Sequence, residues 1–161
     1  MSGHIVEITG DLFSAPPDNS ILVHACNTVG SWGAGIALAF RDRYPEQFEV
    51  YKAHCKLHGS SLVGTCLLIP GDTHDIACLF TSKAYGKRKD SPDQILDATR
   101  SAVIDLVKQN IENKALHSCR INSGKFGVPW EDTRAILEEL GVVVTVYKPL
   151  EEPPQSQPRR R

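Results

Sequence analysis

Residues 24–37, with the sequence HACNTVGSWGAGIA, place a histidine beside a glycine-rich loop. Gly30, Gly33 and Gly35 come directly before an apolar run, where a helix would begin. The first N–H groups of a helix have no partner within it, and glycines let phosphate oxygens approach them. An imidazole that titrates near neutrality can donate a proton to a leaving oxygen or activate a water. The stretch therefore predicts an anion-binding loop with His24 as a candidate acid or base.

A second glycine-rich loop, NSGKFGVP at residues 122–129, also lies between a short apolar segment and a predicted helix. Ligands of open α/β sheets bind where strands end and helices begin, so two such loops predict a diphosphate held between them. The loops match neither common phosphate motif. Phe126 follows Gly124-Lys125 where a Walker loop needs Ser or Thr, and the first loop has the order GxxGxG instead of GxGxxG.

The cysteines are dispersed and form no CxxC pair, which argues against a disulfide framework and a zinc ribbon: Cys26, Cys55, Cys66, Cys78 and Cys119. None of Cys26, Cys55 and Cys119 is followed by the arginine that closes the anion loop of a cysteine-dependent phosphatase. His54 and His58 have the i, i+4 spacing of a zinc pair, but no third ligand or acidic partner is evident. We predict reduced thiols, no metal and no cofactor.

Hydrophobic periodicity predicts strands that alternate with helices along the chain. Strands are expected at residues 4–10, 20–26, 62–69, 75–82, 116–121 and 142–148, and helices at 35–43, 45–58, 92–110 and 129–140. A Pro-Gly-Asp turn separates the third and fourth strands, which suits a hairpin. The last strand is apolar on both faces, as a central position requires. This order predicts a three-layer α/β/α fold with a mixed sheet of about six strands.

The chain has 161 residues, 41% of them hydrophobic and 23% charged, which suits one globular domain over residues 1–150. A net charge of −1 gives no general reason to bind nucleic acid or an acidic membrane. The N-terminus lacks a basic segment before a long apolar stretch, and no window approaches the roughly 18 apolar residues of a membrane span. We expect a soluble monomer in the cytoplasm or nucleus, with a disordered tail at residues 151–161 that ends in Arg159–Arg161.

Three motifs in this order resemble the macrodomain family, whose members bind ADP-ribose. They are TGDLF at residues 9–13, HACNTVGSWGAGIA at 24–37 and INSGKFGVPW at 121–130. The likeness extends over residues 3–148 and is greatest to small fungal macrodomains that act as ADP-ribose 1''-phosphate phosphatases. It implies the macrodomain fold, binding of ADP-ribose or ADP-ribose 1''-phosphate, and hydrolysis of the latter to ADP-ribose and phosphate.

The resemblance also implies which residues contact the ligand. Asp11 would accept a hydrogen bond from the adenine amino group, Asn27 would bind the distal ribose, and Phe126 would pack against that ribose. The other contacts would come from the ends of the two loops and their neighbours: Leu12, Trp32, Gly33, Ala34, Gly35, Ile36, Asn122, Ser123, Gly124, Lys125 and Gly127. Structural alternatives remain, since Asp11 could be a turn residue, Asn27 an Asx-turn former and Phe126 a core residue.

The candidate catalytic residues are His24, Asn27 and Lys83. His24 stands where many macrodomains carry an asparagine, and it could act as the general acid/base, or as the nucleophile, while Asn27 orients the sugar. A structural histidine, buried and satisfied by backbone groups, is the alternative.

Lys83 suggests a second enzymatic reading. A neighbouring macrodomain branch removes ADP-ribose from glutamate side chains with a lysine after a central strand and an aspartate in the second glycine loop. Lys83 lies near the position of that lysine, but Phe126 stands where the aspartate would be. A third hypothesis is a non-catalytic reader of free or protein-linked ADP-ribose. The basic stretch KAYGKRKD, residues 83–90, is either a solvated surface or a means of steering an anionic substrate.

Overall fold

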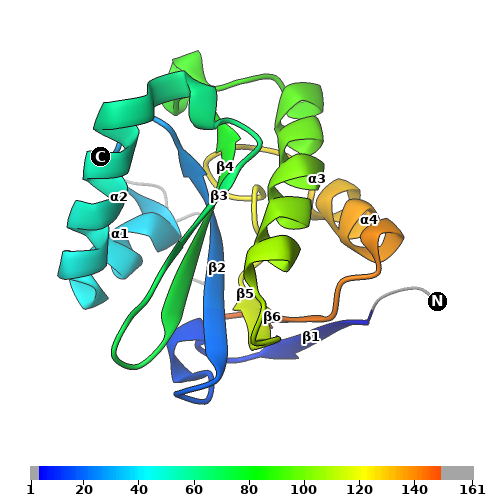
Figure 1. Cartoon of the computed structure of the whole chain (residues 1–161). Helices are drawn as coiled ribbons and strands as arrows, with labels where there is room; N and C mark the ends of the chain where they lie inside the picture. Colours follow the sequence, from blue (N-terminus) through cyan, green and yellow to red (C-terminus); the bar gives the residue numbers. More distant parts are fainter. Residues whose placement is uncertain (1–3, 150–161) are drawn as a thin grey trace, which may run out of the picture.

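A six-stranded sheet separates two pairs of helices in the computed structural model, which describes residues 4–149 (Figure 1). The strand order is β1-β6-β5-β2-β4-β3, and every neighbouring pair is parallel except β3 and β4. Helices α1 and α2 cover one face, and α3 and α4 cover the other. The predicted three-layer fold with a mixed sheet is confirmed. The predicted tail at residues 151–161 lies outside the described residues.

The elements follow the predicted order. The strands are β1 (Ile5–Thr9), β2 (Ser20–Asn27), β3 (Cys66–Ile69), β4 (Asp75–Ser82), β5 (Ala115–Ser118) and β6 (Val144–Lys148). The α-helices are α1 (Gly35–Arg43), α2 (Pro45–His58), α3 (Pro92–Gln109) and α4 (Trp130–Leu140). Short 3-10 helices occur at η1 (Leu12–Ser14), η2 (Gly59–Leu62) and η3 (Gly86–Arg88). The third strand is shorter than predicted, because the chain turns at Gly64 with a φ of +88°.

Strand β2 lies in the middle of the sheet and is buried on both faces. Leu22 and Cys26 point into the core beneath α1 and α2, whereas Ile21 and Val23 point into the core beneath α3 and α4. A parallel strand covered on both faces has little polar alternation, which explains the apolar run in the sequence. Strand β4 is buried in the same way, so β2 and β4 form a rigid centre from which the loops at their carboxyl ends emerge.

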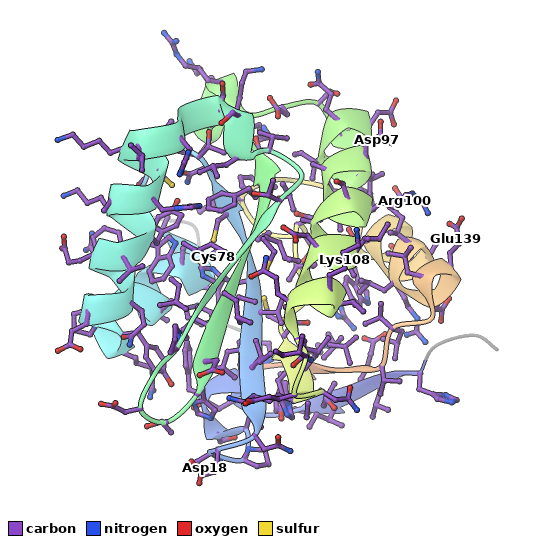
Figure 2. The ribbon with its side chains drawn as sticks, in the orientation of Figure 1. Asp18, Cys78, Asp97, Arg100, Lys108 and Glu139 are labelled. Atoms are coloured by element: carbon purple, nitrogen blue, oxygen red, sulfur yellow. The ribbon has the colours of Figure 1, made fainter. Side chains whose placement is uncertain are left out.

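The outer surface of α3 and α4 is charged. Figure 2 shows charged side chains on this surface, among them Arg100 and Lys108 of α3 and Glu139 of α4, whereas Cys78 lies in the interior. Arg100 and Glu139 are 3.0 Å apart, but both are exposed, so this ion pair contributes little to stability. Helix α3 begins with a capping box between Ser91 and Gln94. Within residues 4–149, no helix combines the length and apolar character needed to cross a bilayer.

Glu7 connects the edge strand β1 to α4. Its carboxylate pairs with Arg120 at 3.0 Å, pairs with Arg134, and accepts a hydrogen bond from the Trp130 indole at 3.3 Å. Burial raises the pKa of Glu7, but the Trp130 hydrogen bond and the two guanidinium groups outweigh burial and hold the pKa below its ordinary value of 4.5.

We expect the substitution Glu7→Gln to lower the free energy of unfolding by up to about 1 kcal/mol near pH 7. Because the folded-state pKa of Glu7 lies below 4.5, its stabilisation is present above pH 4.5 and is lost as the pH falls through the folded-state pKa. Urea unfolding of both proteins at several pH values measures the difference. The free energies of unfolding of wild type and Glu7→Gln should become equal in acid. A difference that persists there would contradict the role given to the Glu7 carboxylate.

Candidate functional site

The two glycine-rich loops emerge side by side at one edge of the sheet. The first glycine loop, residues 27–35, follows β2, and the second glycine loop, residues 122–128, follows β5. Strands β2 and β5 are parallel neighbours, so the loops at their carboxyl ends share an edge. A methyl group placed on Gly35 would lie 4.0 Å from Cγ of Lys125. The loops therefore face one another across a narrow gap, as predicted for a diphosphate site.

Asn27 holds the first glycine loop in shape. Its Oδ1 accepts hydrogen bonds from the N–H groups of Val29 at 3.0 Å and Ser31 at 3.3 Å, and its Nδ2 donates to the Ser31 carbonyl at 2.9 Å. The Tyr51 hydroxyl lies 3.0 Å from the same Oδ1 and 2.8 Å from the Asn27 carbonyl. Asn27 is therefore an Asx-turn residue whose side chain organises the loop from below, and its predicted contact with a ribose remains a prediction.

The end of the first glycine loop is open to solvent. Gly33, Ala34, Gly35 and Ile36 are exposed, and Gly35 is the first residue of α1. No side chain caps this helix, and its first turn carries no acidic residue. The exposed N-terminus thus offers N–H donors and the positive end of the helix dipole to an anion, and the ligand contacts of these four residues remain a prediction.

Asn122 anchors the second glycine loop from inside the protein. Its Oδ1 accepts a hydrogen bond from the Thr81 hydroxyl at 3.0 Å, and its Nδ2 donates to Thr99 at 2.9 Å and to Thr133 at 3.3 Å. It also has a positive φ of 69°, and its carbonyl accepts the N–H of Val128 at 2.9 Å. The side chain is buried, its polar atoms are used, and it positions the loop, while the predicted ligand contact of Asn122 remains a prediction.

The tip of the second glycine loop presents unused donors. Ser123, Gly124, Lys125 and Gly127 are exposed. Within residues 4–149, the N–H groups of Gly124, Lys125 and Phe126 donate to no other backbone group. A run of such donors beside a lysine forms a cradle for phosphate oxygens. The N–H groups of residues 124–126 are thus available to a ligand, whereas those of Ser123 and Gly127 donate to Arg120 and Gly124, and the diphosphate contacts of residues 123–127 remain a prediction.

An ion pair lies next to the first glycine loop, at the end of β4. The Lys83 Nζ is 3.0 Å from Oδ1 of Asp90, whose side chain is only 6% exposed, while the Lys83 side chain is 56% exposed. Asp90 Oδ2 accepts the N–H of Lys83 at 3.0 Å, and Oδ1 has no well-directed hydrogen bond. The hydroxyl of Thr28, which directly follows Asn27, donates to the Lys83 carbonyl at 2.8 Å. The pair is thus fixed to the first glycine loop.

A cleft of about 570 Å³ begins at this ion pair and is lined by Thr28, Val29, Gly59, Ser60, Lys83, Ala84 and Arg88. Basic groups extend from it toward the second glycine loop, since a methyl group on Gly127 would lie 3.9 Å from Cε of Lys89. Clefts lined by one sign of charge concentrate ligands of the opposite sign. Asp90 was not among the predicted site residues. The only signal for it in the sequence is that it is the one acidic residue in the basic stretch 83–90.

The structure places His24 in the core beneath α1 and not in the cleft. Its exposed fraction is 0%, and its ring stacks on Phe40 with centroids 4.0 Å apart and meets Trp32 edge-on at 4.8 Å. A ring enclosed in this way cannot exchange protons with a bound substrate. We therefore assign His24 a packing role, which corrects the predicted general acid/base or nucleophile and agrees with the structural alternative.

We expect His24→Leu to leave the kcat of phosphate release within about twofold of wild type, because a general acid or base would supply about 10²–10⁴-fold. The same substitution should lower the free energy of unfolding by about 1–2 kcal/mol through imperfect packing against Phe40 and Trp32. Kinetics and urea unfolding on one preparation separate the two effects. A hundredfold loss of kcat in a folded variant would restore the catalytic assignment.

Three other residues that the sequence predicts at the ligand have side chains in the core, and their ligand contacts remain predictions. Trp32 is 1% exposed and stacks on Tyr51 at 4.8 Å, so its indole belongs to the core under the first glycine loop. The Leu12 side chain is buried in the same core. Phe126 is buried in a small cluster with Ile95 and Val128, which matches the core alternative and leaves little of the ring for a ribose. Burial of these three apolar side chains stabilises the folded protein, and it fixes the segments of chain that carry them.

Asp11 lies where the sequence predicts, at the end of β1 on the surface. Its Oδ1 accepts the N–H of Phe13 at 3.0 Å and caps η1. It is thus a turn residue as well as an exposed carboxylate, and the predicted contact with adenine remains a prediction.

Comparisons with known proteins agree with this arrangement. A family model described as the Macro domain matches residues 23–137. A protein of Chaetomium globosum named ADP-ribose 1''-phosphate phosphatase is 48% identical, and the match covers 85% of each chain. The macrodomain of Mycobacterium tuberculosis DarG is 30% identical with a TM-score of 0.73, and covers 91% of this chain and 99% of its own. Thermosipho africanus DarTG in complex with ADP-ribose shares the fold at 19% identity and a TM-score of 0.72, over 92% of this chain and 42% of its own.

Proposed function

Because the chain belongs to the Macro domain family, we propose that it binds ADP-ribose 1''-phosphate and hydrolyses its 1''-phosphate to give ADP-ribose and inorganic phosphate. The observation that carries the proposal is the position of the Lys83–Asp90 pair. It lies at a cleft that begins where the first glycine loop begins, next to the predicted diphosphate site. The relative that is 48% identical is named ADP-ribose 1''-phosphate phosphatase, which supports the choice of substrate.

Binding uses the two loops as a clamp. The free N–H groups of residues 124–126 and the uncapped start of α1 approach the diphosphate from opposite sides. Lys125 adds a positive charge between the loops. At the adenine end of the ligand, the Asp11 carboxylate accepts a hydrogen bond from the adenine amino group. This arrangement directs the distal ribose toward Lys83 and Asp90.

The ion pair then supplies the chemistry. The Lys83 ammonium neutralises charge on the phosphoryl oxygens and protonates the leaving 1''-oxygen as its bond to phosphorus breaks. Asp90 Oδ1 is buried 3.0 Å from the Lys83 Nζ, so it holds the ammonium in place at the cleft and keeps it protonated. The Asp90 Oδ2 contact with the Lys83 N–H keeps the carboxylate in place. No covalent intermediate is needed.

The test is phosphate release from ADP-ribose 1''-phosphate, measured alongside calorimetric titration with ADP-ribose. We expect wild type to bind ADP-ribose and release phosphate with turnover, and Lys83→Ala to bind but release it far more slowly. Lys87→Ala, which changes a neighbouring lysine that does not line the cleft, is the matched control. If wild type binds ADP-ribose but releases no phosphate, the proposed hydrolysis is wrong and the protein is a non-catalytic ADP-ribose reader.

A second candidate activity is removal of ADP-ribose from protein glutamate, and the pairing of Lys83 with Asp90 favours it. The sequence offers no aspartate in the second glycine loop, where Phe126 stands, but Asp90 supplies a carboxylate to the lysine from another segment. After the Lys83 ammonium gives up a proton, its amine attacks C1'' of the distal ribose, and the C1''–O bond to the glutamate breaks so that the carboxylate leaves. Opening of the ribose ring then gives an imine, which borohydride reduces to a stable adduct. An adduct on Lys83 after incubation with ADP-ribosylated protein would favour this activity, and its absence would count against it.

A further inference from the structure

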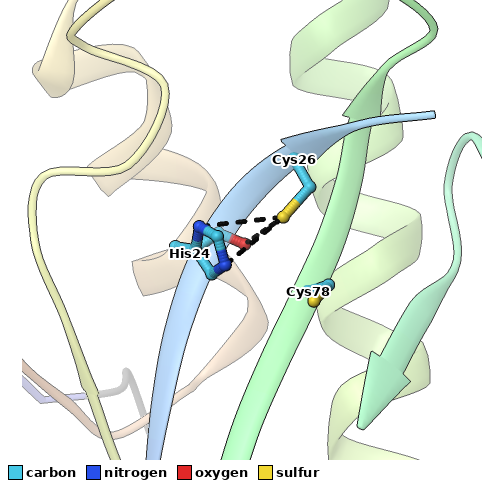
Figure 3. A group of neighbouring side chains, drawn as sticks. All are labelled: His24, Cys26 and Cys78. Carbon is cyan, nitrogen blue, oxygen red and sulfur yellow. Dashed lines mark hydrogen bonds between the residues drawn. The ribbon is translucent and has the colours of Figure 1, made fainter. Parts of the chain in front are cut away.

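We propose that His24, Cys26 and Cys78 form a three-coordinate site for a soft monovalent metal ion, Cu(I), in the core beneath the first glycine loop. The proposal does not depend on the proposed function, because none of these residues contacts the cleft. Figure 3 shows the three side chains converging from β2 and β4. His24 and Cys26 are two residues apart on one face of β2, and Cys78 is the direct neighbour of His24 on β4.

The distances match those of donors that share one ion. One donor atom from each of the three residues lies within 4.8 Å of the other two, and Cys26 Sγ is 3.5 Å from Nε2 and 3.7 Å from Nδ1 of His24. A nitrogen at about 2.0 Å and a sulfur at about 2.3 Å from one metal are roughly 3.5–3.8 Å apart at tetrahedral or trigonal angles. The cluster therefore needs only a small adjustment to close around an ion.

The donor set selects the kind of ion. Two sulfur atoms and one imidazole nitrogen, with no carboxylate, exclude Mg²⁺ and Ca²⁺, which require oxygen ligands. Structural Zn²⁺ takes four ligands, but within residues 4–149 no fourth His, Cys, Asp or Glu joins this group. His24 and Cys78 are fully buried and Cys26 is 3% exposed, which leaves no access for water as a fourth ligand. Cu(I) accepts three soft ligands and suits this site best.

Hydrogen bonding also fits a bound ion. Because both cysteines bind a metal as thiolates, one Cu(I) lowers the net charge of the buried cluster from −2 to −1. Within residues 4–149, the buried indole N–H of Trp32 makes no hydrogen bond of good geometry; it lies near the Cys26 thiol, and the Trp32 ring is edge-on to the His24 ring. An unpaired buried donor is costly, and a metal-bound thiolate beside it would accept its hydrogen bond.

The test is anaerobic loading of reduced protein with Cu(I) in competition with a chromophoric chelator. Because the site is enclosed, the ion is supplied both to folded protein and during refolding. We expect one equivalent of copper in wild type and in Cys119→Ser, a cysteine outside the cluster, and at least about tenfold weaker retention in Cys26→Ser and Cys78→Ser. Retention that is unchanged in the two cluster variants, or lost in Cys119→Ser, would overturn the proposal.

X-ray absorption on copper-loaded wild type keeps the proposal testable if the cluster variants fail to fold. We expect a first shell of two sulfurs and one nitrogen, together with a rise in Tm on loading. A shell without nitrogen, no retained copper, or equally tight binding of Zn²⁺ would each contradict the site.

Discussion

Replacing Asp90 by Asn is expected to lower kcat for phosphate release from ADP-ribose 1''-phosphate by about 10²–10³-fold, while ADP-ribose binding stays within about threefold of wild type. The amide still fills the buried position and accepts the Lys83 N–H through its oxygen, so the chain path is kept. The amide carries no charge, so it no longer pairs with the Lys83 ammonium that lies 3.0 Å from Oδ1, and the ammonium loses its fixed position at the cleft. The substitution therefore lowers the rate of phosphate release but leaves the binding of ADP-ribose by the two glycine loops unchanged.

The measurement is kcat at saturating substrate, with calorimetric titration on the same preparation. Asp93→Asn is the matched control, because Asp93 is an exposed aspartate in the first turn of α3, three residues further on. The control should keep wild-type kcat. If Asp90→Asn keeps the wild-type kcat, the Asp90 carboxylate takes no part in the reaction, and Lys83 is the one remaining candidate of the pair.

Replacing Asn27 by Ala is expected to raise the Kd for ADP-ribose by about 10- to 100-fold, a loss of about 1.4–2.8 kcal/mol. The amide makes the hydrogen bonds that fix Val29 and Ser31, so its removal frees the first glycine loop before a ligand binds. In Asn27→Ala the loop must become ordered when the ligand binds, which costs conformational entropy. In wild type the loop is already ordered in the folded protein, so binding carries no such cost. The effect should appear in the affinity for ADP-ribose itself and not only in turnover.

Tyr51→Phe is the matched comparison for Asn27. This substitution removes one hydroxyl donor to Asn27 but leaves the amide bonds to Val29 and Ser31 in place. We expect a rise in Kd of less than about fivefold, measured by the same titration. Equal effects of Asn27→Ala and Tyr51→Phe would show that the amide contacts in the loop are not what prepares it for the ligand.

The sequence was sufficient to predict the layers and the loops for physical reasons. Apolar periodicity reports which side of an element is buried, and glycines before helices report where backbone must stay accessible. Both are local properties. The element order, the hairpin of β3 and β4, and the two glycine loops at one edge of the sheet followed from them.

The errors concern side chains whose roles depend on their surroundings. Strand β2 is buried on both faces, so no alternation reveals that His24 points beneath α1 and not toward the loop. Trp32 lies within an exposed glycine loop and is nevertheless buried, because the loop folds over α2. Asp90 pairs with Lys83 across the loop that contains η3, and no α-helix or strand spans the two positions. Long-range packing decides each case, and a single sequence does not encode it locally.

A crystal structure of the protein with ADP-ribose tests the central claim most directly. We predict that the diphosphate oxygens lie within hydrogen-bond distance of the N–H groups of residues 124–126, with the distal ribose directed toward Lys83 and Asp90 and His24 still buried. A complex in which the diphosphate lies away from both glycine loops, or in which the distal ribose points away from the Lys83–Asp90 pair, would contradict the account.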